Sequence, residues 1–88
     1  MSGASKVERV VRGVLRDVLG ISQSRVDAFD VDTELFGSLP ELDSMAVAGL
    51  LTEMEDRLGI VIDDDDVDGD MLATFGALCD FAESKVRA

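Results

Sequence analysis

The sequence contains no histidine, tryptophan or tyrosine, and only one cysteine, Cys79. Without a histidine or a glycine-rich phosphate loop, no serine or cysteine has an evident general base to activate it as a nucleophile. A lone cysteine cannot form an intramolecular disulfide, so a reducing compartment presents no difficulty. Cys79 falls among the apolar residues near the C-terminus, where packing in a core is the expected role. We therefore expect a protein that is not an enzyme.

Basic residues are scarce, since eight Lys and Arg stand against nineteen Asp and Glu, for a formal net charge of −11. An acidic field repels DNA phosphates and anionic lipid, and it attracts basic protein surfaces in a salt-dependent way. The start of the sequence, MSGASKVERVVR, lacks a signal-peptide pattern, and no apolar run is long enough to span a membrane. We expect no nucleic-acid binding, no membrane insertion and a cytoplasmic location.

Large aromatic side chains are also rare, because the 88 residues include only four Phe. A chain of this length has room for one domain with a small core, and here that core must be mainly aliphatic. We expect a single, monomeric domain over residues 1–88, with its folded core at about residues 5–86, and an all-α fold.

Three stripes of apolar residues recur with the spacing of an α-helix. They predict main helices at about residues 5–19, 44–58 and 75–86. Residues suited to helix termini flank them: Ser5 with Glu8 as a capping box, Gly20 and Gly59 as C-terminal glycines, Ser44 or Asp43 as one N-cap, and Thr74 as another.

The connections between the predicted helices are of two kinds. Residues 21–43 form a long loop that lacks helical periodicity, and a loop of that length is usually functional or disordered. Its apolar content favours an ordered loop that packs on the bundle; these residues are Val26, Phe29, Val31, Leu35, Phe36, Leu39 and Leu42. After Gly59 we expect an extended connector with Ile62 buried, and then a short helical turn near residues 65–71.

The string Asp43-Ser44-Met45 resembles the Asp-Ser-Leu attachment motif of acyl carrier proteins, with Met in place of Leu. Residues 32–36 (DTELF) resemble the segment before that motif, and residues 53–62 (EMEDRLGIVI) resemble the end of the family's second helix. The resemblance extends over roughly residues 7 to 86. SLPELDSM departs from the usual Leu-Gly-x-Asp-Ser-Leu, and Gly49 replaces a common acid. These features are more similar to stand-alone carriers of specialised bacterial gene clusters than to the housekeeping fatty-acid carrier.

The resemblance implies an acyl-carrier-like bundle of three main helices plus a short extra helical turn, with a long loop between the first two helices. It also implies that a phosphopantetheinyl transferase attaches 4′-phosphopantetheine to Ser44, beside Asp43. The arm would carry acyl groups as thioesters to acyl-transferring, ketosynthase-type or acyl-activating enzymes of fatty-acid, polyketide or related biosynthesis. The plainer alternative is that Ser44 only caps a helix, as serine commonly does.

Two further sets of residues follow from the same resemblance. A surface for basic patches on partner enzymes would comprise Met45, Ala48, Glu41, Glu53, Glu55 and Asp56, with Asp43 beside them; the alternative is an ordinary solvated face. A pocket for the acyl chain would be lined by Leu50, Met54, Leu58 and Ile62; the alternative is core packing alone.

A different function is suggested by the acidic run Asp63–Asp70, which could make the chain a small calcium-binding protein. Asp64, Asp66, Asp68 and Gly69 fit the start of an EF-hand loop. Phe75, however, occupies the position where that loop needs a bidentate glutamate. The sequence therefore predicts no specific metal site, and at most a weak divalent-cation site in this run.

Overall fold

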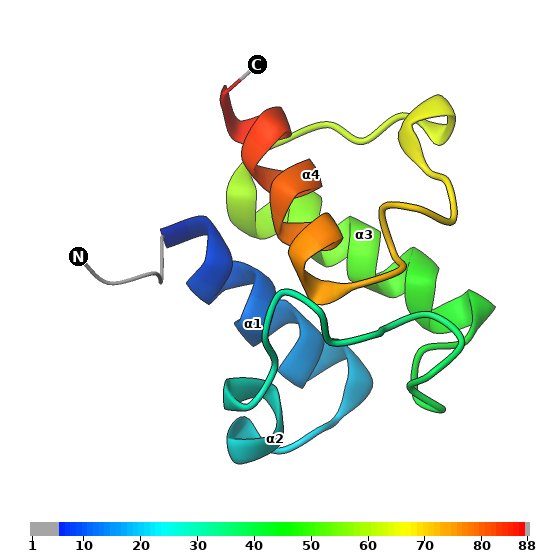
Figure 1. Ribbon diagram of the computed structural model, residues 1–88. Coiled ribbons are helices and arrows are strands. Elements are labelled where there is room, and N and C mark those ends of the chain that lie inside the picture. The colour runs from blue at the N-terminus through cyan, green and yellow to red at the C-terminus, as the bar shows by residue number, and fades with distance from the viewer. Residues whose placement is uncertain (1–5, 88) are drawn as a thin grey trace.

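The computed structural model describes residues 6–87, and the helical periodicity of the sequence is realised in it as a bundle (Figure 1). Its elements are α1 (Lys6–Leu19), α2 (Gln23–Asp27), α3 (Ser44–Leu58), the 3₁₀ turn η1 (Asp64–Asp66) and α4 (Phe75–Arg87). No strand forms within residues 6–87, where the only β-pairing is an isolated bridge between Glu34 and Thr74. The expected all-α fold with three main helices is therefore confirmed.

Two short elements differ from the sequence prediction. Residues 21–43 were expected to be free of helix, yet α2 forms there, because the Ser22 side chain accepts a hydrogen bond from the Arg25 N–H and Val26 is buried. One helical turn is too short to show periodicity. The turn expected near residues 65–71 lies earlier, at η1. There the Asp63 N–H donates to the Asp66 carboxylate at 3.0 Å, and the Asp66 N–H donates to the Asp63 carbonyl at 2.9 Å.

The long loop packs onto the bundle, as its apolar content predicted. Phe29, Leu35 and Leu42 are buried in it. Backbone hydrogen bonds join it to the segment before α4: the Leu35 N–H donates to the Ala73 carbonyl (3.0 Å) and the Phe75 N–H donates to the Thr33 carbonyl (2.8 Å). The loop is therefore an ordered part of the fold. Val31 and Phe36, in contrast, remain exposed.

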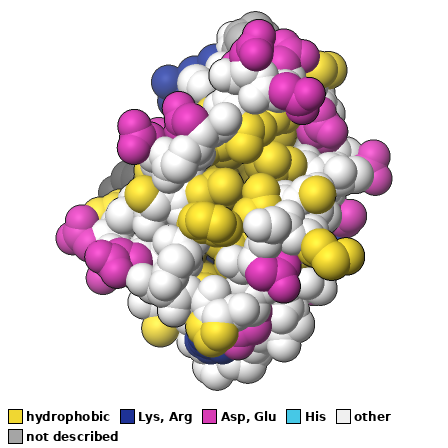
Figure 2. All heavy atoms as spheres, turned by 90° about the vertical axis from the view of Figure 1, so that its right-hand side faces the viewer, with side chains coloured by type: hydrophobic (Ala, Val, Ile, Leu, Met, Phe, Trp, Pro, Cys, Tyr) yellow, Lys and Arg dark blue, Asp and Glu magenta, His cyan; other side chains and the backbone are white. Residues whose placement is uncertain are grey.

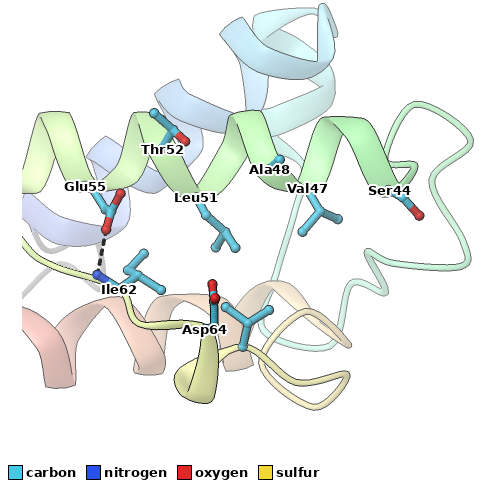
Figure 3. Close-up of a pocket in the computed structure, with 9 residues that line it drawn as sticks. Ser44, Val47, Ala48, Leu51, Thr52, Glu55, Ile62 and Asp64 are labelled. Atoms are coloured by element: carbon cyan, nitrogen blue, oxygen red, sulfur yellow. Dashed lines mark hydrogen bonds between the residues drawn. The ribbon is translucent and has the colours of Figure 1, made fainter.

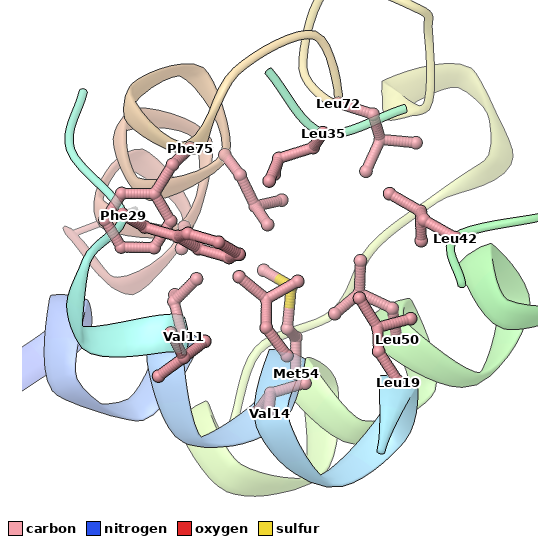
Figure 4. Packing of buried hydrophobic residues seen from close by; sticks show 14 of the residues in the cluster. Val11, Val14, Leu19, Phe29, Leu35, Leu42, Leu50, Met54, Leu72 and Phe75 are labelled. Atoms are coloured by element: carbon pink, nitrogen blue, oxygen red, sulfur yellow. The ribbon is translucent and has the colours of Figure 1, made fainter. Parts of the chain in front are cut away.

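The core lies between α1, α3 and α4, and it is almost entirely aliphatic (Figure 4). Val11 and Val14 of α1 face Leu50 and Met54 of α3, and all four are fully buried. Phe29 and Phe75 meet edge to face, with 5.9 Å between their ring centroids. Burial of these side chains supplies most of the free energy that holds the helices together.

Helix ends follow the local rules of capping. Gly20 and Gly59 adopt left-handed backbone angles (φ 68° and 65°) at the ends of α1 and α3. Thr74 caps α4, since its hydroxyl accepts from the Ala77 N–H at 3.1 Å. The capping box predicted for Ser5 and Glu8 lies partly outside the described residues, because Ser5 is not among them. None of the helices described between residues 6 and 87 has the length and apolarity needed to cross a bilayer.

Candidate functional site

The first turn of α3 resolves which residue caps that helix. The Asp43 carboxylate accepts a hydrogen bond from the Ala46 N–H at 2.8 Å, and the Asp43 backbone is extended, as an N-cap requires. Ser44 is the first residue inside the helix. The interpretation that Ser44 only caps the helix is therefore wrong, because Asp43 already makes that contact.

The Ser44 side chain is exposed, and its hydroxyl points away from the end of α3 (Figure 3). The other serines described within residues 6–87 each use their hydroxyl in a hydrogen bond, and they are Ser22, Ser24, Ser38 and Ser84. The Ser44 hydroxyl, in contrast, makes no hydrogen bond to the described residues. The positive end of the helix dipole lies beside it and favours a phosphate there.

A groove of about 510 Å³ begins at Ser44 and follows one face of α3 (Figure 3). The helix wall of the groove consists of residues three or four positions apart: Ser44, Val47, Ala48, Leu51, Thr52 and Glu55. The connector after α3 forms the opposite wall with Ile62, Asp64 and Val67. On the same side of the molecule, hydrophobic side chains gather in a central hollow with acidic side chains around it (Figure 2).

Two contacts hold the connector that forms this outer wall. The Ile62 N–H donates to the Glu55 carboxylate at 2.7 Å, which joins the wall to α3. Asp66 of η1 forms an ion pair with Lys85 of α4, and the hydrogen bond from Lys85 lowers the pKa of that carboxyl. The groove is thus bounded by a helix on one side and a tethered segment on the other.

A second hollow, of about 240 Å³, meets the groove at Ser44. It lies between α3 and the segment before α4, and its lining includes Phe36, Asp68, Gly69 and Leu72. Ser44 therefore stands where two depressions join, with the larger one running along α3.

The residues predicted to line an acyl-chain pocket have a different placement from the one expected. Of the four, only Ile62 lines the groove. Leu50 and Met54 are fully buried in the core, and Leu58 packs partly buried against it. The apolar stripe on α3 is wide, and the sequence alone could not separate the edge that packs on α1 from the edge that remains open.

Four groove residues were not singled out from the sequence: Val47, Leu51, Thr52 and Val67. Val47 and Leu51 belonged to the predicted apolar stripe but were read only as helix periodicity. Their positions three and seven residues after Ser44 place them on the same helix face as that serine. The place of Val67 in the groove could not be predicted from the local sequence, because only the fold of the acidic run brings this residue opposite α3.

The predicted partner surface lies beside Ser44 and is only partly acidic. Met45 is 85% exposed and Ala48 is also exposed. Glu41 forms an ion pair with Arg25 at 2.6 Å, and the hydrogen bond from Arg25 lowers the pKa of the Glu41 carboxyl.

Of the acids further along α3, two carboxylates bind other groups of the chain and one remains exposed. Glu53 pairs with Arg57 at 2.8 Å, and Glu55 is occupied by the Ile62 N–H. Asp56 is exposed and makes no hydrogen bond or ion pair with the described residues. The structure thus places all the predicted contact residues on or near α3 but offsets part of their charge.

The acids considered for calcium do not converge. Asp66 pairs with Lys85, and the Asp68 carboxylate accepts from the Met71 N–H at 3.0 Å. Asp64 instead faces the groove (Figure 3). Among residues 6–87, no three acidic or cysteine side chains come together as a group that could hold a metal ion.

Comparison with known proteins gives two matches and one negative result. Residues 9–82 match the family described as the phosphopantetheine attachment site. The fold is similar to the solution NMR structure of a holo acyl carrier protein from Nitrosomonas europaea, with a TM-score of 0.85 and 33% sequence identity over 96% of this chain and 100% of that one. No curated protein sequence matches this chain.

Proposed function

This chain belongs to the acyl carrier protein family, with 4′-phosphopantetheine as its covalent cofactor, and from that premise we propose that Ser44 is the residue that bears the arm. The observation that supports Ser44 most strongly is its free, exposed hydroxyl at the start of α3, beside a cap that Asp43 provides. We propose further that residues 1–88 form one monomeric carrier domain.

The residues around Ser44 fit a phosphodiester-linked group. The hydroxyl is accessible to an approaching enzyme, and the N-terminus of α3 places positive potential beside the phosphate that would form there. The groove that begins at Ser44 offers space and apolar surface next to the attachment point. Nothing in the described chain would have to unfold to expose this hydroxyl.

The role of the chain in this reaction is placement. A phosphopantetheinyl transferase would transfer the arm from coenzyme A to the Ser44 oxygen, and the chain need supply no base. When bound, the arm supplies a terminal thiol that holds an acyl group as a thioester. Members of the acyl carrier protein family are non-catalytic carriers.

Delivery requires partner enzymes of fatty-acid, polyketide or related acyl biosynthesis, which we propose dock on α3 through basic patches. Met45 and Ala48 supply an exposed apolar centre next to Ser44. Asp56 supplies a negative charge that is not paired with the described residues. Glu41 and Glu53 pair with arginines of this chain, and each could instead bind a Lys or Arg of the docking enzyme. Exposed contacts of this kind favour rapid, reversible encounters, which suit a shuttling carrier.

The test is a mass measurement on the intact chain after incubation with coenzyme A and a broadly specific transferase. We expect the wild-type chain to gain the mass of one phosphopantetheine group and Ser44→Ala to gain none. Ser38→Ala is the matched control, since it removes a serine hydroxyl from the loop before α3 and should leave loading intact. Loading of Ser44→Ala, or no loading of the wild type, would refute the proposal.

A further inference from the structure

The loop that leads into Ser44 contacts a single basic side chain, which belongs to Arg25. The sequence has no other Lys or Arg between residues 20 and 56, a stretch that holds nine Asp and Glu. Arg25 lies in α2 and donates two hydrogen bonds to the Glu41 carboxylate, at 2.6 and 3.2 Å. Both oxygens of that carboxylate are therefore occupied by one guanidinium, in the bidentate arrangement that arginine favours.

Arg25 reaches Glu41 from a turn that the bundle holds in place. The neighbouring side chain, Val26, is fully buried, and the Val26 carbonyl accepts a hydrogen bond from Arg12 of α1. The backbone N–H of Arg25 donates to the Ser22 hydroxyl at 3.1 Å. The guanidinium is therefore presented to Glu41 from a fixed backbone.

The segment that contains Glu41 does not depend on this ion pair for its position. For residues 37–43, the pair with Arg25 is the only polar contact that reaches a distant part of the described chain, since their other hydrogen bonds join residues at most four apart. Apolar packing holds the segment instead, because Leu42 is buried and Leu39 packs partly buried against the core. Loss of the pair should therefore leave the segment in place.

The ion pair is accessible to an approaching enzyme. The Arg25 side chain is 41% exposed and that of Glu41 is 32% exposed. A pair with this exposure contributes little to stability, so a cation of another protein can displace Arg25 at small cost. Glu41 precedes Ser44 by three residues, at most about 11 Å of chain. The Glu53–Arg57 pair begins nine positions after Ser44, about 14 Å along α3, so Glu41 is the nearer of the two neutralised acids.

From these contacts we propose that Arg25 is a specificity-determining residue for docking at Ser44, because it occupies a carboxylate that a basic partner would otherwise bind. This inference rests on the proposed function, in which basic patches dock beside Ser44. A partner with a Lys or Arg opposite Glu41 displaces Arg25 and gains the contact. A partner without that cation meets a neutral loop and a guanidinium that repels its basic patch, so Arg25 discriminates between basic enzymes.

Loading kinetics test the proposal. The kcat and KM of a broadly specific phosphopantetheinyl transferase are measured at low salt with the wild-type chain, Arg25→Gln, Glu41→Gln and the double variant. Arg25→Gln leaves Glu41 open to the enzyme and should lower KM by up to about five-fold with kcat unchanged. Glu41→Gln should raise KM, and the double variant, whose net charge equals that of the wild type, should lie between the two single variants.

Arg87→Gln is the matched control for net charge. It also removes one positive charge from an exposed arginine, but at the C-terminal end of α4, away from the start of α3 (Figure 1). It should change KM much less than Arg25→Gln does. In about 1 M sodium chloride, where the Debye length is about 3 Å, the difference between Arg25→Gln and the wild type should disappear.

The outcomes separate this inference from the proposed function. An unchanged or higher KM for Arg25→Gln would overturn the role of Arg25, and a lower kcat in both single variants would show that the pair instead shapes the loop. Equal effects of Arg25→Gln and Arg87→Gln would also overturn it, because net charge alone would then explain them. These results leave Ser44 as the attachment residue, whereas a wild-type chain that gains no mass would overturn both.

Discussion

At the scale of single residues, Asp43 and Ser44 have different roles at the start of α3. The Asp43 carboxylate accepts a hydrogen bond from a backbone N–H there, and the Ser44 hydroxyl makes no hydrogen bond with the described residues.

Arg12 contacts two other parts of the fold from α1. It donates to the Phe29 carbonyl at 2.9 Å and lies 4.5 Å above the Phe75 ring. One side chain thus joins α1, the long loop and α4.

Asp17 provides a residue-scale prediction about pH. Hydrogen bonds from Arg16 and then Arg57 lower the pKa of the Asp17 carboxyl to about 2. Because this pKa is lower in the folded state than in the unfolded state, the ionised carboxylate stabilises the fold at neutral pH. That contribution is lost as the pH falls from about 4 toward 2.

We therefore expect Asp17→Asn to be less stable than wild type above about pH 5, with the difference disappearing near pH 2. Urea denaturation at a series of pH values measures it. Because the pair is exposed, the difference will be small. Arg57→Gln removes one of the two donors and should reproduce part of the effect. A difference that does not change between pH 7 and pH 2 would contradict this account.

At the scale of elements, α4 is positioned by a close approach to the long loop. The Gly76 N–H donates to the Val31 carbonyl at 3.1 Å, and a Cβ placed on Gly76 would lie 2.8 Å from that same oxygen. Real side chains do not approach a backbone oxygen so closely. The loop and the start of α4 can therefore meet only because residue 76 has no side chain.

Gly76→Ala should lower the free energy of unfolding by about 1–3 kcal/mol, the usual cost of overpacking. Gly49→Ala is the matched control in the middle of α3, where the added Cβ meets its nearest atom, on Val18, at an ordinary 3.6 Å. It should raise stability by about 0.5–1 kcal/mol through helix propensity. Urea denaturation of the two variants should show opposite signs, and equal effects would show that the contact with Val31 is unimportant.

At the scale of the whole molecule, the net charge of −11 opposes the compact state. The ion pairs within residues 6–87 offset only part of it, since most of their side chains are partly exposed and such pairs contribute little. The molecule extends 35 × 30 × 21 Å, so repulsion across it is strongly screened once the Debye length falls to about 8 Å, at 0.15 M salt. Because the exposed ion pairs contribute little, we expect added salt to weaken the self-repulsion by more than it weakens the ion pairs.

Added salt should therefore raise the melting temperature. Relief of about 1 kcal/mol corresponds to roughly 4–8 °C in a domain of this size. Thermal unfolding in increasing sodium chloride measures the effect, and choline chloride at equal ionic strength is the control for specific cation binding. The two salts should act alike. A melting temperature that does not respond to either salt would mean that self-repulsion is negligible.

Local patterns in the sequence were enough to predict the three main helices and to single out Ser44 as the candidate attachment residue. Apolar spacing over two or more turns produces a strong periodic signal, and glycine, threonine and aspartate mark helix ends for local steric and hydrogen-bonding reasons. The motif around Ser44 is likewise contiguous. By contrast, α2 was missed, because a single turn stabilised by one cap and one buried valine has no period to detect.

The amino-acid order thus determined, by itself, the helices, the acidic charge and the serine at the head of α3. Only the tertiary structure decided which edge of α3 is open, so that Val47 and Leu51 line the groove while Leu50 and Met54 are buried. It also brought Asp64 and Val67 opposite that helix. The physical reason is that burial depends on neighbours distant in the chain, and those neighbours are defined only once the helices and connectors have packed together.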